Sequence, residues 1–201
     1  MHHKKLLLAT NNKGKAREYK SLLRGIPYDI VTPAEAGIST EVEETGATFE
    51  ENARLKATTL AAESGLLSLA DDSGLEVDAL GGEPGPLSAR HAGEDATDRD
   101  RIDYLLKRLK DVPEKERTAR FRCVIAIAEP GGRVEVCAGE SRGLITTAPR
   151  GEHGFGYDPV FYVPERGKTM AELAPEEKNR ISHRGQAAEK AKALLINWET
   201  V

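Results

Sequence analysis

The sequence predicts a protein of the α/β class. Strand-like apolar runs alternate along the chain with segments in which apolar residues recur at helical spacing, the order typical of that class. With 201 residues, the chain is long enough for one large domain with a real hydrophobic core. Two later strands form an expected antiparallel hairpin, so the sheet is predicted to be mixed rather than purely parallel.

The chain is predicted to begin with a strand, a loop and a helix. The strand covers residues 5–10, and a polar turn follows it. Ala16, Tyr19 and Leu22 then recur at helical spacing. Residues 26–32 form a second expected strand, which a proline stops.

An acidic loop over residues 41–46 precedes the next helix. Thr48 and Glu51 have the spacing of a capping box, which predicts a helix start there and an end near residue 64. The apolar residues 66–70 then form a strand that leads into two aspartates. This order continues the α/β alternation.

The second half contains a further helix, a hairpin and a last helix. Thr97 resembles a helix start, and four apolar residues form the buried side of that helix. Residues 119–128 and 133–138 are the hairpin strands, and the last helix is expected over residues 186–198. We find no linker or repeat, so residues 1–201 are interpreted as a single domain.

Composition excludes several classes of partner. The net charge of −4 and the pI near 5.8 argue against a nucleic-acid polymer. No apolar run is long enough for a membrane helix or a signal peptide, so we expect no membrane partner and a cytoplasmic location. Cys123 and Cys137 are interpreted as reduced packing residues, because nothing nearby completes a metal set.

The most informative motif is the acidic pair Asp71 and Asp72, which is followed by Ser73. Carboxylates at the end of a strand are typical oxygen ligands of Mg²⁺, which also uses substrate phosphates. The alternative is that both aspartates only cap the next segment and turn the chain. The pair alone does not decide between these interpretations.

A polar turn between the first strand and the first helix resembles a phosphate cradle. Free backbone N–H groups and lysines at such a turn attract anions. The turn matches neither the P-loop pattern nor the dinucleotide-binding pattern, and an ordinary polar turn stays the alternative. Its residues are Thr10, Asn11, Asn12, Lys13, Gly14 and Lys15.

Three further features suit a nucleotide, although each also has a purely structural interpretation. Lys56 follows Asn52 by four residues, so both lie on one face of the predicted helix. Two aromatic rings are interleaved with glycines and followed by an acid, in a segment that has the means to sandwich a flat base. A late cluster supplies hydrogen-bond donors. The members of the last two features are Phe155, Gly156, Tyr157, Asp158, Lys178, His183 and Arg184.

Together these motifs resemble the inosine/xanthosine triphosphate pyrophosphatases, also called HAM1-like or noncanonical purine NTP pyrophosphatases. The resemblance spans nearly the whole chain. The segments that carry it are residues 10–15, 43–53, 70–75, 85–90, 154–159 and 182–185.

The resemblance implies an elongated mixed sheet flanked by helices, with two lobes around a nucleotide-binding cleft, and commonly a homodimer. It also implies Mg²⁺-dependent hydrolysis of ITP, dITP or XTP to the monophosphate and pyrophosphate, which cleanses the nucleotide pool. Asp72 is then the proton acceptor and a metal ligand, Glu43 is the second metal carboxylate, and Asp71 is a supporting ligand.

The resemblance also implies the substrate-binding residues. Lys15, Lys56 and the turn of residues 10–15 hold the triphosphate, and Ser73 contacts substrate beside the metal. Phe155 and Tyr157 stack on the base, with Gly156 between them. Lys178, His183 and Arg184 donate to the 6-oxo group, and Asp158 accepts from a ring N–H.

Two other functions stay open at this stage. Maf-like nucleotide pyrophosphatases perform similar chemistry on other nucleotides. A non-catalytic nucleotide-binding module is the other alternative, because cationic side chains and aromatic rings can bind a nucleotide without turning it over. Acidic side chains that face a polyphosphate count against it, because they are hard to justify without a metal.

Overall fold

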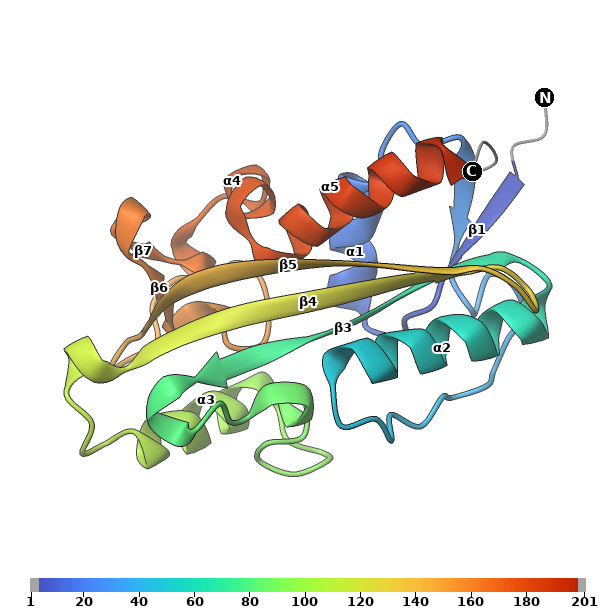
Figure 1. Ribbon diagram of the computed structural model, residues 1–201. Helices are drawn as coiled ribbons and strands as arrows, with labels where there is room; N and C mark the ends of the chain where they lie inside the picture. The colour runs from blue at the N-terminus through green and yellow to red at the C-terminus, as the bar shows by residue number, and fades with distance from the viewer. Residues whose placement is uncertain (1–3, 199–201) are drawn as a thin grey trace. The chain divides into compact units, whose positions relative to one another are not determined.

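The computed structural model of the chain describes residues 4–198 and has an α/β fold (Figure 1). Its sheet has seven strands in the order β2-β1-β3-β4-β5-β6-β7. The first pairs are parallel and the last are antiparallel, which confirms the mixed sheet. The strands are β1 (Lys4–Leu8), β2 (Tyr28–Val31), β3 (Leu67–Val77), β4 (Thr118–Ala128), β5 (Val134–Ile145), β6 (Phe161–Val163) and β7 (Lys168–Thr169).

The helices begin where the sequence supplies caps. Thr48 accepts from the Glu51 N–H and Glu51 accepts in return, so the predicted capping box is confirmed. Thr97 and Asp100 form a second box. The helices are α1 (Lys13–Leu22), α2 (Phe49–Ser64), α3 (Asp98–Arg108), α4 (Pro175–Ile181) and α5 (His183–Ile196). Short 3-10 turns cover Asp78–Leu80, Gly85–Leu87, Glu114–Glu116, Asp158–Val160, Pro164–Arg166 and Met170–Glu172.

The chain divides into two compact units. Of the described residues, the first unit takes 4–72, 123–139 and 184–198, and the second takes 73–122 and 140–183. Strands β3, β4 and β5 contribute residues to both units.

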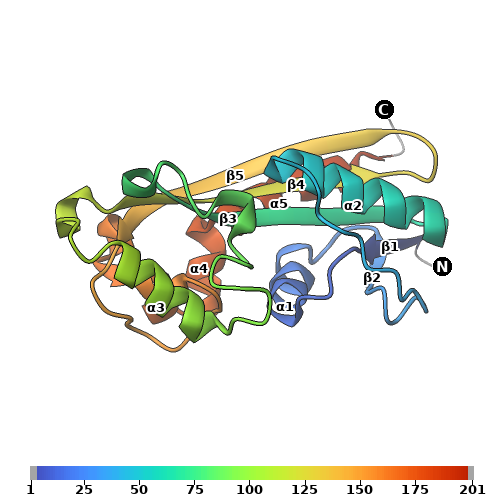
Figure 2. The same cartoon turned by 90° about the horizontal axis from the view of Figure 1, so that it is seen from below.

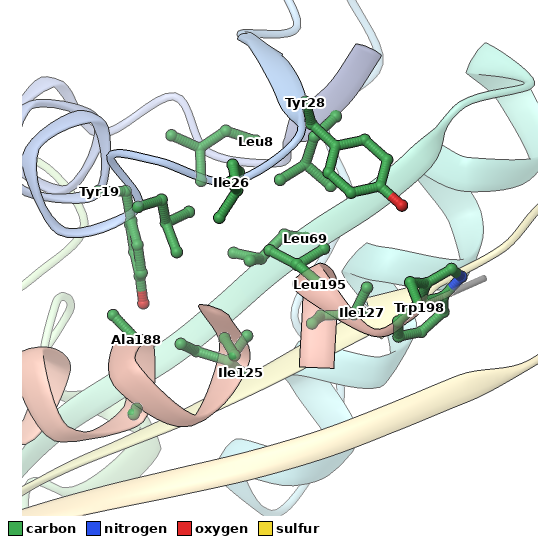
Figure 3. Close-up of a cluster of buried hydrophobic side chains, with 14 of the residues drawn as sticks. Leu8, Tyr19, Ile26, Tyr28, Leu69, Ile125, Ile127, Ala188, Leu195 and Trp198 are labelled. Atoms are coloured by element: carbon green, nitrogen blue, oxygen red, sulfur yellow. The ribbon is translucent and has the colours of Figure 1, made fainter. Parts of the chain in front are cut away.

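The first unit has a hydrophobic core on each face of its sheet. Helices α1 and α5 cover one face and α2 covers the other (Figure 1). Tyr19, Leu69 and Ile125 are completely buried between the sheet and helices α1 and α5, and Leu195 and Trp198 belong to the same core (Figure 3). Seen from below, α2 runs along β4, and small alanines of the helix and strands allow close approach (Figure 2).

The second unit has its own core. Leu105 of α3, Phe161 of β6 and Met170 are completely buried in it, and Phe121 packs on Phe161 with the ring centroids 4.3 Å apart. This core also contains Tyr157, only 4% exposed. The aromatic segment after residue 150 is therefore built onto a packed base.

The structure differs from the predicted elements in several places. Strand β5 continues to Ile145 where we expected it to end at residue 138, and helix α4 and strands β6 and β7 were not predicted. The difference that bears on the site is in β3. We expected the strand to end before the two aspartates, but β3 continues through them to Val77. The interpretation of Asp71 and Asp72 as turn residues is therefore wrong. Within the strand, Asp71 lies beside the cations Lys15 and Arg184, and Asp72 lies beside Asn52 and Lys56. Among the helices of residues 4–198, none combines the length and apolarity that a membrane span requires.

Candidate functional site

The acidic pair lies in the middle of β3, and its two side chains are nearly inaccessible to solvent. Asp71 is 2% exposed and Asp72 is 4% exposed. Successive strand residues point to opposite faces of a sheet. Asp71 accordingly meets residues of α1 and α5, and Asp72 meets residues of α2. We call these five residues, Lys15, Asn52, Lys56, Asp71 and Asp72, the acidic site.

Asp71 is held between cations. Its Oδ2 lies 3.1 Å from Nζ of Lys15 and 3.6 Å from Nη2 of Arg184. Arg184 is itself buried and pairs at 2.6 Å with Oε2 of Glu18. Burial raises the pKa of Asp71, but Lys15, Arg184 and Lys56 outweigh it and hold that pKa well below its usual value. Asp71 is therefore an anchor that stays ionised at neutral pH.

The negative charge of Asp72 is balanced by nearby cations less fully than that of Asp71. Its Oδ2 accepts a hydrogen bond of 3.0 Å from the side-chain amide of Asn52, and its Oδ1 lies 3.8 Å from Nζ of Lys56. Burial raises the pKa of Asp72 above its usual value despite the opposing charges of Lys56 and Lys15. A carboxylate whose pKa is raised by burial is better able to take a proton from a reacting water.

Lys56 joins the acidic loop to β3. Its Nζ donates to the carbonyl oxygen of Asp71 and to Oε1 of Glu44, each at 2.6 Å. Burial lowers the pKa of Lys56, but the charges of Asp71, Asp72 and Glu44 raise it overall, so the amine stays cationic. Glu43, the expected metal ligand, is exposed, whereas its neighbour Glu44 is half-buried beside the acidic site.

The predicted phosphate turn begins α1. Asn12 is the N-cap, and its Oδ1 accepts the N–H of Lys15 at 3.0 Å. The N–H of Asn12 donates to Oγ1 of Thr10 at 3.2 Å, so the turn is fixed by its own side chains. Asn11 and Lys13 are exposed. Half-buried Gly14 follows them at the start of α1, where N–H groups and the helix dipole favour an anion.

The aromatic loop, residues 154–158, belongs to the second unit. The Phe155 N–H donates to Oδ2 of Asp158 at 2.9 Å, and Nζ of Lys178 lies 2.5 Å from the same oxygen. That Nζ also lies 5.1 Å from the centre of the half-buried Phe155 ring. The Tyr157 ring is buried, and its hydroxyl donates to the Ser88 carbonyl at 3.1 Å. Phe155 therefore keeps more accessible ring surface than Tyr157.

Two other predicted residues of the second unit have clear positions. His183 is buried and its ring stacks on Phe121, with the centroids 4.7 Å apart. Ser73 follows the acidic pair in β3 and is half-buried. Of the residues predicted to bind the nucleobase, the structure brings Phe155, Asp158 and Lys178 into one contact network.

The carboxylate oxygens in and beside the acidic site suit a metal ion that completes its coordination with substrate phosphates. Within residues 4–198 there is no group of three or more acidic, histidine or cysteine side chains arranged to hold a metal ion. Asp72 and the half-buried Glu44 offer carboxylate oxygens, and Asp71 has its Oδ2 committed to cations. Mg²⁺ is commonly bound by one or two carboxylates plus phosphates and water, so the set fits that ion.

The sequence analysis assigned no site role to three residues that contribute to these contacts. Asn52 orients Asp72, Glu18 pairs with Arg184, and Glu44 rather than Glu43 pairs with Lys56. The four-residue spacing of Asn52 and Lys56 contained the signal for the first. Glu18 and Glu44 gave none, because their partners are distant in the sequence.

Comparison with known proteins gives a consistent result over nearly the whole chain. A sequence model described as the Ham1 family matches residues 6–194. A protein of Desulforamulus reducens named dITP/XTP pyrophosphatase is 56% identical over 191 residues, which are 95% of this chain and 95% of the relative. A Bacillus licheniformis protein with the same name is 50% identical over 192 residues, covering 96% of this chain and 98% of the relative.

Solved structures agree with these relatives. A HAM1 protein from Coxiella burnetii superposes with a TM-score of 0.88 at 45% identity, over 96% of this chain and 98% of the other. The Staphylococcus aureus Ham1 protein gives a TM-score of 0.85 at 44% identity, over 96% of this chain and 98% of the other.

Proposed function

Because the chain belongs to the Ham1 family, we propose that it hydrolyses noncanonical purine nucleoside triphosphates such as ITP, dITP and XTP. The products are the nucleoside monophosphate and pyrophosphate. The observation that carries this proposal is the acidic site, where Asp72 lies buried beside Asn52 and Lys56 while Asp71 pairs with Lys15. Carboxylates and amines gathered in this way suit a triphosphate and a divalent ion.

Asp72 is the proposed proton acceptor. Attack of water on the α-phosphorus requires a base that orients the water and removes its proton as pyrophosphate leaves. Asn52 fixes Oδ2 of Asp72, which sets the direction of the carboxylate. Burial raises the pKa of this group, and this increases its basicity when ionised.

The lysines of the acidic site bind the polyphosphate. Lys15 beside Asp71 and Lys56 beside Glu44 supply positive charge for the phosphates. The turn of residues 10–14 adds N–H donors at the start of α1. Ser73 contacts the substrate next to Asp72. These contacts hold the α-phosphorus in line for attack and place the leaving group against cations.

Mg²⁺ is the proposed cofactor, with Asp72 and an acidic residue of the loop, Glu43 or Glu44, as its protein ligands. When bound, it neutralises phosphate charge and acidifies water. We assign Asp71 a positioning role instead of a metal-binding one. Its contacts with Lys15 and Arg184 support this assignment.

The nucleobase of the substrate is recognised by the aromatic loop and by the hydrogen-bond donors that the sequence analysis predicted. Phe155 stacks on the ring, with Gly156 and Tyr157 completing the loop that carries it. Lys178 and His183 donate to the 6-oxo group and Asp158 accepts a ring N–H. Adenine presents an amino group to such donors and leaves them unpaired, so ATP is a poor substrate. The pairing of Arg184 with Glu18 and Asp71 favours a positioning role for Arg184.

A panel of triphosphates tests the proposal. Pyrophosphate release from ITP, XTP, dITP, ATP, GTP, UTP and dUTP is measured with Mg²⁺ and with excess chelator. We expect release from ITP, dITP and XTP, little from ATP, and none with chelator. Preference for UTP or dUTP would instead indicate Maf-like specificity. Tight ITP binding without pyrophosphate release would indicate a non-catalytic module.

A homodimer is the proposed assembly, and it follows from the family resemblance. Sedimentation velocity at micromolar concentration measures it directly. A species of twice the chain mass of 21.9 kDa is expected. A single species of the monomer mass would contradict it.

A further inference from the structure

Asp98 links helix α3 to the aromatic loop. It is the first residue of α3, and its Oδ2 accepts the backbone N–H of Gly156 at 2.7 Å. Its Oδ1 lies 2.5 Å from Nη2 of Arg101. The cap of α3 is supplied by Thr97 and Asp100, so the helix start does not use the Asp98 side chain for capping. This carboxylate instead holds residue 156.

A second connection fixes the next residue of the loop. Tyr157 donates its hydroxyl to the Ser88 carbonyl at 3.1 Å. Arg101, the partner of Asp98, donates through Nη1 to the Ala89 carbonyl at 2.6 Å. Tyr157 is thus bonded directly to the Ser88 carbonyl. Gly156 is connected to the next carbonyl, that of Ala89, through Asp98 and Arg101. Such a closed set of hydrogen bonds restricts both position and rotation of the loop.

The residue that these anchors orient is Phe155. It precedes Gly156, whose φ of +62° belongs to the left-handed region that glycine adopts readily. The peptide group before Phe155 is held as well, because the Phe155 N–H donates to Oδ2 of Asp158. The direction of the aromatic ring therefore depends on whether the Gly156 amide stays in place.

We propose that Asp98 is a positioning residue for nucleobase recognition. It acts through the Gly156 N–H and holds the loop so that Phe155 is pre-oriented for stacking. This inference rests on the proposed function, in which Phe155 contacts the base. Pre-orientation lowers the entropic cost of binding, so its loss weakens binding and leaves the chemical step at Asp72 unchanged.

Steady-state kinetics on ITP test the inference with Asp98→Ala and Asp98→Asn. For Asp98→Ala we expect KM to rise roughly tenfold with kcat within about threefold of wild type, since a hydrogen bond to a charged group is lost. Asp98→Asn keeps an acceptor oxygen for Gly156 and is expected to recover part of the loss. Asp103→Ala is the matched control, because Asp103 lies on the same helix, is exposed and pairs with Arg99.

Product inhibition distinguishes weaker binding of the nucleobase from weaker binding of the phosphates. The inhibition constant of inosine monophosphate is expected to rise in Asp98→Ala, while that of pyrophosphate stays unchanged. An unchanged KM for ITP and an unchanged constant for inosine monophosphate in a folded Asp98→Ala would overturn the inference. An equal rise for both inhibitors would also overturn it. Failure of the wild type to release pyrophosphate from ITP would instead refute the proposed function.

Discussion

Asp71 and Asp72 are consecutive residues of β3, yet their surroundings shift their pKa values in opposite directions. Both carboxylates are buried, which by itself raises the pKa of each. Three cations outweigh burial at Asp71, whereas at Asp72 burial prevails. One strand therefore supplies an anion that organises cations and a carboxylate available for proton transfer. This is the division of roles expected of paired acids with different environments.

The Asp71 anchor makes a prediction about stability. Asp71→Asn removes the anion between Lys15 and Arg184, and breaking such a buried pair costs roughly 3 kcal/mol of unfolding free energy. Urea denaturation at pH 7 measures this loss. Glu50→Gln is the control, because Glu50 forms an exposed pair with Arg54 and we expect a loss below about 0.5 kcal/mol. Equal losses in the two variants would contradict the assignment of Asp71.

The same variant has an expected pH dependence. A folded-state pKa below the unfolded value means that the unfolded chain binds the extra proton, so the contribution of Asp71 is full at neutral pH and falls with acidification. The stability difference between wild type and Asp71→Asn should therefore shrink below about pH 4, the usual range for Asp. A difference that stays constant from pH 7 to pH 3 would be inconsistent with the lowered pKa.

Two buried serines give opposite predictions for one substitution. Within residues 4–198, Ser68 Oγ is buried and has no hydrogen-bond partner, whereas Ser88 Oγ accepts from the Leu75 N–H and donates to the Gly85 carbonyl. Ser68→Ala should leave stability unchanged or raise it by up to about 1 kcal/mol. Ser88→Ala should lower it by about 1–3 kcal/mol. Thermal unfolding of the pair measures the contrast, and a loss at Ser68 equal to that at Ser88 would contradict it.

The two thiols should differ in reactivity. Burial raises the pKa of Cys123 to about 12 and that of Cys137 to about 11, and Cys123 is completely buried whereas Cys137 is half-buried. Since the thiolate is the reactive form, both should react slowly at pH 8 and Cys137 first. Mass spectrometry after timed alkylation assigns each site. Both should react quickly in urea, and equally fast labelling of Cys123 in the folded protein would be the opposite result.

Gly154 should be intolerant of any side chain. A Cβ there would lie 2.0 Å from Oδ2 of Asp158 and 3.1 Å from Nζ of Lys178, and its φ is +79°. Gly154→Ala should therefore disturb the Lys178–Asp158 pair and raise KM for ITP. Gly167→Ala controls for backbone strain, because its φ is +64° and a Cβ at that position would meet no atom of residues 4–198 within 4 Å. Equal KM values in both variants would show that the close contact is unimportant.

The sequence was a good guide to local structure. The capping box at Thr48 and the helix start at Thr97 were predicted correctly, because a cap depends on residues three positions apart. The end of β3 was not, since the partners that Asp71 and Asp72 meet lie on α1, α2 and α5, far from β3 in the sequence. Pairings such as Glu18 with Arg184 depend on packing between distant segments, which no local pattern contains.

The central claim is that Asp72 performs the proton transfer while the rest of the acidic site holds the substrate. It is tested most directly by the rate of pyrophosphate release from saturating ITP and Mg²⁺ in wild type and Asp72→Asn, with circular dichroism to verify the fold. We expect the rate to fall by a factor of about 10³, within the range for loss of a general base. A folded Asp72→Asn that releases pyrophosphate at the wild-type rate would contradict the account.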